Sequence, residues 1–273
     1  MILSYLTSLF FTQTWAKTST SDLSWWQVMA PPEDISVNGH LIDWLFYYTT
    51  GMNIFFFVLV CAGLFGFSFL YYHKRHPKPY YTYGNKKIHV IIATAIGLAV
   101  FLAVDMNITR ISNNDYTDVF ANFPNENEEE VLRVQVMAQQ WMWNFRYAGA
   151  DGVFNTEDDV ITMNDLRLPI NKKIVFQIVS KDVIHSFFLP NARQKVDAIP
   201  GRLTRMWVEL VKPGNYPIVC AEMCGTFHYR MQAYLTVYNE ADFADWMNEA
   251  ERNAVKENEL ENADLYWGWK WEL

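Results

Sequence analysis

Two cysteines, a histidine and a methionine recur within twelve residues near the end of the chain. They are Cys220, Cys224, His228 and Met231, in a segment that begins and ends with apolar residues. A second histidine, His185, comes earlier and lies between two pairs of apolar residues. Thiolate, thioether and imidazole donors in apolar surroundings favour copper over hard cations. These residue types at this spacing therefore predict a copper site.

Other interpretations explain only part of this donor set. Cys220 and Cys224 could form a disulfide, because the topology argued below places them outside the cytoplasm. Zinc could bind the two cysteines and a histidine, but a thioether gives no reason to choose zinc. A methionine at a strand edge commonly serves as core packing. We favour copper, since it suits all the donors at once.

The number of thiolates indicates which kind of copper site to expect. A mononuclear blue-copper site uses two histidines, one cysteine and a weak axial methionine. Here there is a second cysteine on the same short loop, so both sulfurs can face one point and bridge two copper ions. His185 and His228 would then cap the two ends. An electron shared by two metals changes the geometry of the site little on reduction. A loop held between strands keeps the ligands still, and both properties suit rapid electron transfer.

This constellation resembles the binuclear copper (CuA) motif of cytochrome c oxidase subunit II. The resemblance covers roughly residues 40–250 and includes the segments 140–145, 180–187 and 197–202. The ligand positions that match are His185, Cys220, Glu222, Cys224, His228 and Met231.

The resemblance implies a role for each ligand. His185 and Met231 would share one copper, His228 and the backbone carbonyl of Glu222 would serve the other, and both cysteines would bridge. The Glu222 carboxylate would reach a magnesium or manganese ion at the boundary with the catalytic subunit. From the residues alone, a solvated loop charge is the preferred interpretation of that carboxylate.

The resemblance also implies the function of an electron-accepting subunit in a respiratory terminal oxidase. Electrons would pass from cytochrome c, or from a fixed haem subunit, through the copper pair to haem in the catalytic haem–copper subunit I. Oxygen reduction and most proton translocation would belong to that subunit, so this chain would be an oxidoreductase and translocase subunit with other oxidase subunits as partners. Trp141 matches the aromatic residue through which electrons enter, although a tryptophan in a strand is usually buried.

Three other functions differ in what they require. A membrane-tethered copper carrier would need labile, exposed ligands. A quinol oxidase subunit of similar structure usually lacks the copper ligands, all of which are present here. A nitrous oxide reductase shares the copper motif but has a second, histidine-rich domain that this chain lacks.

Composition indicates a chain with membrane and water-soluble parts. Of 273 residues, 51% are hydrophobic and 16% aromatic, while the formal net charge is −8. That charge argues against nucleic acid as a partner and favours a basic protein. Cys61 is the third and last cysteine, so no disulfide framework is expected, and the absence of a Cys-x-x-Cys-His sequence means that the electron donor is a separate molecule.

The first 107 residues predict a membrane anchor. Residues 1–16 could be a signal peptide without the usual basic start or an interfacial segment, and the linker to residue 40 follows. Residues 41–107 predict a transmembrane helical hairpin, with spans at Leu41–Tyr72 and Ile88–Met106. The loop between them carries five basic residues and no acidic one, so it should be cytoplasmic. We therefore expect a multi-pass protein of a bacterial inner membrane, with its soluble domain in the periplasm.

Residues 108–239 predict an all-β domain, a cupredoxin-like Greek-key barrel by the family resemblance. Val131–Tyr147 reads as one strand with Trp141 and Trp143 on the same face. Further strands are expected at Lys173–Val179, Thr204–Val211, Tyr216–Cys220 and Met231–Tyr238. Residues 240–273 should hold a short helix, Glu240–Asn253, and a tryptophan-rich tail.

An acidic face is expected to receive the donor protein. The candidate docking residues are Glu157, Asp158, Asp159 and Asp182. Association between opposite charges weakens as salt rises.

Overall fold

The computed structural model describes residues 30–75, 78, 81, 83–125, 131–156 and 158–257. Its described residues fall into two compact units, one within His40–Asn122 and one formed by the chain on either side of it. The predicted signal or interfacial segment at residues 1–16 and the tryptophan-rich tail lie outside the described residues, and so does Glu157.

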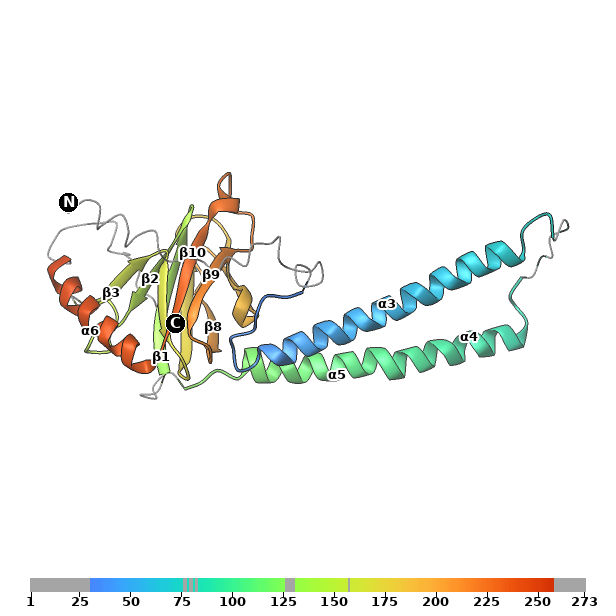
Figure 1. The fold of residues 1–273 in the computed structure, drawn as a ribbon, viewed down its shortest axis with the longest axis horizontal. Coiled ribbons are helices and arrows are strands. Elements are labelled where there is room, and N and C mark those ends of the chain that lie inside the picture. The colour runs from blue at the N-terminus through green and yellow to red at the C-terminus, as the bar shows by residue number, and fades with distance from the viewer. Residues whose placement is uncertain are drawn as a thin grey trace. The chain divides into compact units, whose positions relative to one another are not determined.

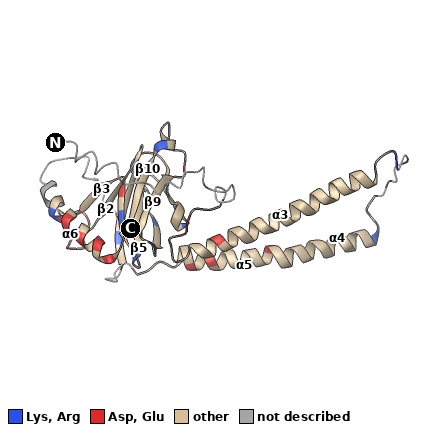
Figure 2. Ribbon diagram, in the orientation of Figure 1, with Lys and Arg blue, Asp and Glu red and all other residues tan. Residues whose placement is uncertain are grey.

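The first unit consists of two long apolar helices that run in opposite directions (Figure 1). Helix α3 spans Gly39–Leu70, and the second helix runs from Lys87 to Ala121. At 1.5 Å per residue, either helix exceeds the hydrocarbon core of a bilayer, about 30 Å thick. Large apolar side chains such as Phe57 and Phe65 are exposed in this unit, which suits contact with lipid tails. In α3 the charged residue Asp43 lies near the start, and the second helix has no charged residue between Lys87 and Asp105 (Figure 2).

The second helix is longer than the predicted span. It comprises α4 (Lys87–Val100), a π-helical stretch η1 (Phe101–Asp105), α5 (Met106–Asp115) and a second π-helical stretch η2 (Tyr116–Ala121). The helix therefore continues fifteen residues past Met106 and includes residues 108–121, which were expected to belong to the β domain.

The second unit is a sandwich of two five-stranded sheets, and it confirms the cupredoxin-like architecture. One sheet has the order β3-β2-β1-β5-β8 and the other the order β4-β10-β9-β6-β7. The strands of the first are β1 (Val131–Gln139), β2 (Met142–Tyr147), β3 (Val160–Met163), β5 (Lys173–Ser180) and β8 (Thr204–Glu209); those of the second are β4 (Asp165–Pro169), β6 (His185–Leu189), β7 (Gln194–Ala198), β9 (Gly214–Cys220) and β10 (Gln232–Tyr238).

Aromatic side chains fill the space between the sheets next to the predicted ligands. The ring of Phe187 lies 5.3 Å from Trp143, 5.4 Å from Phe176 and 6.1 Å from Phe145, measured between centroids. All four side chains are fully buried. Tilted and edge-on aromatic pairs at these distances add stability beyond their buried area. The core therefore gives the neighbouring site a rigid, water-free wall.

The expectation of one strand over Val131–Tyr147 is wrong. The chain reverses at Gln140–Trp141, and β1 pairs with β2 in antiparallel register, with Ala138 opposite Trp143. Trp143 points into the core while Trp141 sits in the turn and is only partly buried. The turn was missed because it contains no Gly, Pro, Asn or Asp, the residues that usually indicate a reversal.

The segment before α3 packs onto the sandwich. Ile35 is fully buried in its core. The backbone N–H of Ile35 donates to Asn191 O at 3.0 Å, and Val211 N–H donates to Ile35 O at 2.8 Å. The chain on the two sides of the helical unit is thus joined through backbone hydrogen bonds.

The C-terminal helix α6 spans Glu240–Glu257 and covers part of the sandwich, which confirms the predicted helix (Figure 1). Trp246 packs edge-on against the buried ring of Tyr147, with 5.4 Å between centroids. The guanidinium of Arg167 lies over the Trp246 ring, 5.2 Å from the ring centroid. An amphipathic stripe on α6 therefore attaches it to the sheets.

Candidate metal centre

The predicted ligands come from two places in one sheet. His185 is the first residue of β6, and Cys220 is the last residue of its neighbour β9. Cys224 and His228 lie on the loop from β9 to β10, and Met231 ends that loop. Cys220 N–H donates to Met231 O at 3.2 Å, which closes the base of the loop. The loop is therefore fixed at both ends by strands.

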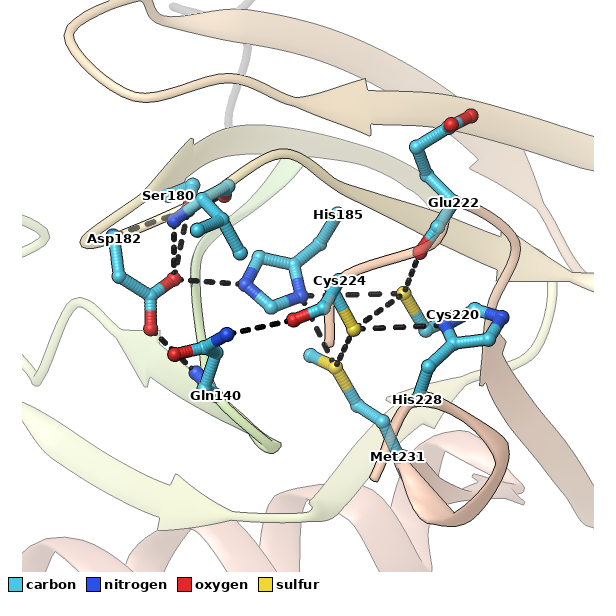
Figure 3. A network of polar contacts seen from close by, with 10 residues as sticks. Gln140, Ser180, Asp182, His185, Cys220, Glu222, Cys224, His228 and Met231 are labelled. Atoms are coloured by element: carbon cyan, nitrogen blue, oxygen red, sulfur yellow. Dashed lines mark hydrogen bonds and ion pairs between the residues drawn. The ribbon is translucent and has the colours of Figure 1, made fainter. Parts of the chain in front are cut away.

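The structure brings all these side chains together (Figure 3). The two cysteine sulfurs are 3.8 Å apart and not bonded to each other. Cys224 Sγ lies 3.5 Å from His228 Nδ1 and 3.7 Å from Met231 Sδ. His185 Nδ1 lies 3.1 Å from Met231 Sδ and 3.9 Å from Cys220 Sγ.

This donor set fits a metal centre. Atoms bound to one metal at about 2.0–2.3 Å with tetrahedral angles lie roughly 3.3–3.8 Å apart, close to the distances seen here. The ligand atoms of His185, Cys220 and Cys224 all lie within 4.8 Å of one another, and all three residues are buried. Without a metal, two thiols, a thioether and an imidazole facing one point would make only weak hydrogen bonds. Soft sulfur donors with imidazole suit copper or zinc rather than hard cations.

The donors are arranged on two sides of the sulfur pair. His185 Nδ1 and Met231 Sδ face each other on one side, and His228 Nδ1 lies by Cys224 on the other. The backbone carbonyl of Glu222 is 3.2 Å from Cys220 Sγ. The Glu222 carboxylate points away from the cluster and is exposed (Figure 3).

Asp182 orients one of the imidazoles. Its Oδ1 lies 2.8 Å from His185 Nε2, and the histidine is fully buried. A proton on Nε2 that is donated to this carboxylate leaves the Nδ1 lone pair free to face the sulfurs. This arrangement fixes the ring orientation and raises the basicity of the ligand nitrogen. The sequence analysis treated Asp182 only as a docking charge. Its position three residues before His185 was the signal that could have revealed its contact with that histidine.

The electrostatics of the pocket favour one thiolate. Burial raises the pKa of Cys220, but hydrogen bonds with His185, with the backbone of Ser186 and Glu222, and with Cys224 together outweigh burial and lower the pKa to about 6. Burial and the charge of Cys220 raise the pKa of Cys224. Burial lowers the pKa of His185, but contacts with Cys220 and Asp182 reverse this and raise it overall. The pocket thus favours one thiolate over two, and binding of a cation would favour loss of the second proton.

Trp141 lies beside the ligand loop. Its ring meets Phe227 edge-on, with 4.8 Å between centroids. Phe227 and the neighbouring Met223 and Tyr229 are exposed, by 44%, 75% and 68% respectively. These side chains form an apolar surface around the metal centre that sequence reasoning did not identify. Apolar residues alternating with ligands in a loop were the signal that could have revealed it.

Asp159 is not a surface charge, contrary to expectation. It is 3% exposed, lies 3.4 Å from the guanidinium of Arg146 and accepts a hydrogen bond from Asn155 N–H. A side chain enclosed in this way cannot contact a donor protein. Asp158 stays on the surface side of this loop, where the Thr156 hydroxyl lowers its pKa.

The fold and the site together define a class of protein. It is a cupredoxin-like sandwich with a buried sulfur–imidazole cluster that could hold a metal ion, joined to a pair of apolar helices of membrane-spanning length.

Comparison with known proteins shows which families and chains this protein is similar to. Residues 132–238 match the family model of the cytochrome c oxidase subunit II periplasmic domain. The alternative cytochrome c oxidase subunit 2 of Bradyrhizobium diazoefficiens is 29% identical over an alignment of 271 positions. The alignment covers 88% of this chain and 92% of that protein. The probable cytochrome c oxidase subunit 2 of Rickettsia prowazekii is 28% identical, covering 89% of this chain and 78% of that protein. The solved periplasmic domain of cytochrome oxidase subunit II from Bradyrhizobium japonicum is 28% identical, with a TM-score of 0.42, and spans 48% of this chain and 99% of that domain.

Residues 132–238 therefore match the cytochrome c oxidase subunit II periplasmic domain, and the chain is similar to curated cytochrome c oxidase subunit 2 proteins along most of its length.

Proposed function

We propose that this chain is the electron-accepting subunit of a haem–copper terminal oxidase and that its metal centre binds two copper ions. The observation that carries the proposal is the pair of unbonded cysteine sulfurs, 3.8 Å apart, with an imidazole on each side and the Met231 thioether on the His185 side. His185 and Met231 would hold one ion, and His228 and the Glu222 carbonyl the other. Cys220 and Cys224 would bridge them.

When bound, the copper pair supplies a one-electron redox centre whose charge is shared over two metals and two sulfurs. The protein keeps this centre rigid and dry. The loop is closed at its base by the Cys220–Met231 hydrogen bond, and His185 is held by Asp182. Rigid, buried ligands leave little to reorganise when charge arrives or leaves.

Trp141 is the proposed point at which electrons enter from cytochrome c. Its indole is partly exposed and packs against Phe227 on the ligand loop. The exposed Met223, Phe227 and Tyr229 give a donor protein an apolar surface to dock against. The electron would leave toward haem in the catalytic subunit I, where oxygen reduction and proton translocation take place.

The hydrogen bonds of Ile35 support a membrane topology in which both ends of the helical pair lie on the same side. The segment before α3 and the sandwich after η2 are parts of one folded unit. The loop between the helices carries Lys74, Arg75, Lys78, Lys86 and Lys87, which favours the cytoplasm. The sandwich then lies in the periplasm, and the chain crosses the bacterial inner membrane twice.

Glu222 is the proposed ligand of a magnesium or manganese ion at the boundary with the catalytic subunit. Its backbone faces the metal centre while its carboxylate is exposed and directed outward, where a partner could supply further oxygen ligands (Figure 3).

The proposal is tested by loading the detergent-solubilised full-length chain with copper. We expect two copper ions per chain and an electron paramagnetic resonance spectrum whose hyperfine pattern shows one electron shared by two copper nuclei. Cys224→Ser should abolish that pattern. Cys61→Ser, which changes a thiol within α3, is the matched control and should preserve it. One ion per chain, or a pattern from a single copper nucleus, would refute the proposal.

A membrane-tethered copper carrier is the alternative function. The structure disfavours it, because Cys220, Cys224, His185 and Met231 are all buried. A carrier should lose its copper to an excess of chelator within minutes, whereas an electron-transfer centre should retain it.

A further inference from the structure

The turn that carries Trp141 is tied to the metal centre through its neighbour Gln140. The side-chain Nε2 of Gln140 donates to the backbone carbonyl oxygen of Cys224 at 2.7 Å. The backbone N–H of Gln140 donates to Asp182 Oδ2 at 2.6 Å. The β1–β2 turn is thus attached both to the ligand loop and to the carboxylate that holds His185.

The ligand loop is shaped to receive this turn at Gly225. A Cβ atom at that position would lie 2.8 Å from Gln140 Nε2 and 3.3 Å from the Trp141 ring, both closer than side-chain carbons normally approach. The φ angle of Gly225 is +125°, a conformation that favours glycine. The absence of a side chain therefore lets Gln140 and Trp141 contact the loop directly.

Asp182 contacts both the predicted ligand His185 and the turn that carries Trp141. One of its oxygens accepts from His185 Nε2 at 2.8 Å and the other accepts from the Gln140 backbone at 2.6 Å (Figure 3). Through this one carboxylate, the orientation of a metal ligand and the position of the tryptophan turn depend on each other.

We propose that Gln140 is a positioning residue, which holds the Trp141 indole against the ligand loop so that electrons from a protein donor pass efficiently to the metal centre. This inference rests on the proposed function of the site. The Trp141 indole is partly exposed and meets Phe227 edge-on, and the two hydrogen bonds of Gln140 fix the turn that carries it to the ligand loop and to Asp182. The alternative is that the Gln140 contacts only stabilise the hairpin.

The test replaces Gln140 with methionine, which keeps the side-chain length and removes the donor. One neutral hydrogen bond contributes about 1 kcal/mol, so the ratio of held to released turn should fall about fivefold. We expect the rate constant for electron transfer from reduced cytochrome c to fall by up to about fivefold at saturating cytochrome, with little change in KM. The rate with a small inorganic reductant should not change. Gln139→Met, at the adjacent position, is the matched control.

A double-mutant cycle separates positioning from simple stabilisation. If Gln140 acts through the indole, Gln140→Met should have no further effect on electron transfer in a Trp141→Ala background. Hairpin stabilisation alone would make the two effects additive.

The copper spectrum distinguishes this inference from the proposed function. Gln140→Met should retain the wild-type copper content and paramagnetic resonance spectrum. If wild-type protein itself shows no shared-electron spectrum, the proposed function fails. If the spectrum is present but Gln140→Met transfers electrons at the wild-type rate, or if Gln140→Met alters the spectrum, the positioning role is overturned while the proposed function stands.

Discussion

Removal of the Asp182 carboxylate should weaken copper binding more than any other change outside the ligands themselves. Asp182 Oδ1 lies 2.8 Å from Nε2 of the fully buried His185, and the carboxylate also accepts from the backbone N–H of Gln140 and Val183, both at 2.6 Å. These bonds lower the pKa of Asp182 although its partial burial raises it. The side chain is therefore an anion at neutral pH, held in one orientation.

The magnitude follows from the loss of those bonds. Loss of the group that orients a metal-binding histidine typically weakens metal binding about 10–100-fold. Because the Asp182 side chain is 30% exposed, water replaces part of the interaction. We therefore expect the copper affinity of Asp182→Ala to be about tenfold lower than that of the wild type. Asp182→Asn keeps an acceptor oxygen but loses the charge. Charge-assisted hydrogen bonds are about twice as strong as neutral ones, so about a threefold loss is expected.

Copper affinity is measured by competition with a chelator of known affinity, using the full-length chain in detergent. Asp245→Ala removes an exposed carboxylate of α6 and is the control for net charge. The order of affinities should be wild type and Asp245→Ala, then Asp182→Asn, then Asp182→Ala. Equal affinities for wild type and Asp182→Ala would show that the carboxylate does not orient His185 for metal binding.

Three further predictions concern stability and docking. Ile35→Ala should lower the free energy of unfolding by about 2–4 kcal/mol in urea titrations, because it leaves a cavity in the core, whereas Val37→Ala, at a position 39% exposed, should cost less than about 1 kcal/mol. Burial raises the pKa of Asp159 from 3.8 to about 6, so the folded state binds this proton more tightly than the unfolded state does. Its contribution to stability is therefore present below about pH 4 and is lost as the pH rises through about 6; Asp159→Asn should remove that part of the pH dependence, and an unchanged slope would contradict the assignment. Turnover with soluble cytochrome c should show weaker binding as salt rises, and indifference to ionic strength would exclude acidic docking.

Much of this protein can be predicted from local sequence. The ligands cluster within a few residues because a short loop must supply several donors, so Cys220, Cys224, His228 and Met231 are recognisable from spacing. The two apolar helices are recognisable because lipid requires an unbroken apolar segment of fixed minimum length. Four expected strands are confirmed, at residues 173–179, 204–211, 216–220 and 231–238. Each expected end lies within two residues of the observed end.

The short strands β3, β4, β6 and β7 could not be predicted in the same way. Each has four or five residues, too few for an alternating pattern to show clearly. They are strands because neighbouring strands satisfy their backbone groups, as β10 does for β4. That pairing is decided between segments far apart in the chain.

The amino-acid sequence by itself determined the donor set, the apolar helices and the class of metal that the donors suit. Only the tertiary structure decided that Trp141 lies in a turn, that Asp182 orients His185, that Asp159 is buried beside Arg146 and that Ile35 completes a core formed by residues more than ninety positions away. The reason is physical: ligand chemistry and apolar length are properties of side chains in sequence, whereas burial, hydrogen-bond partners and orientation depend on which distant segments the fold brings into contact.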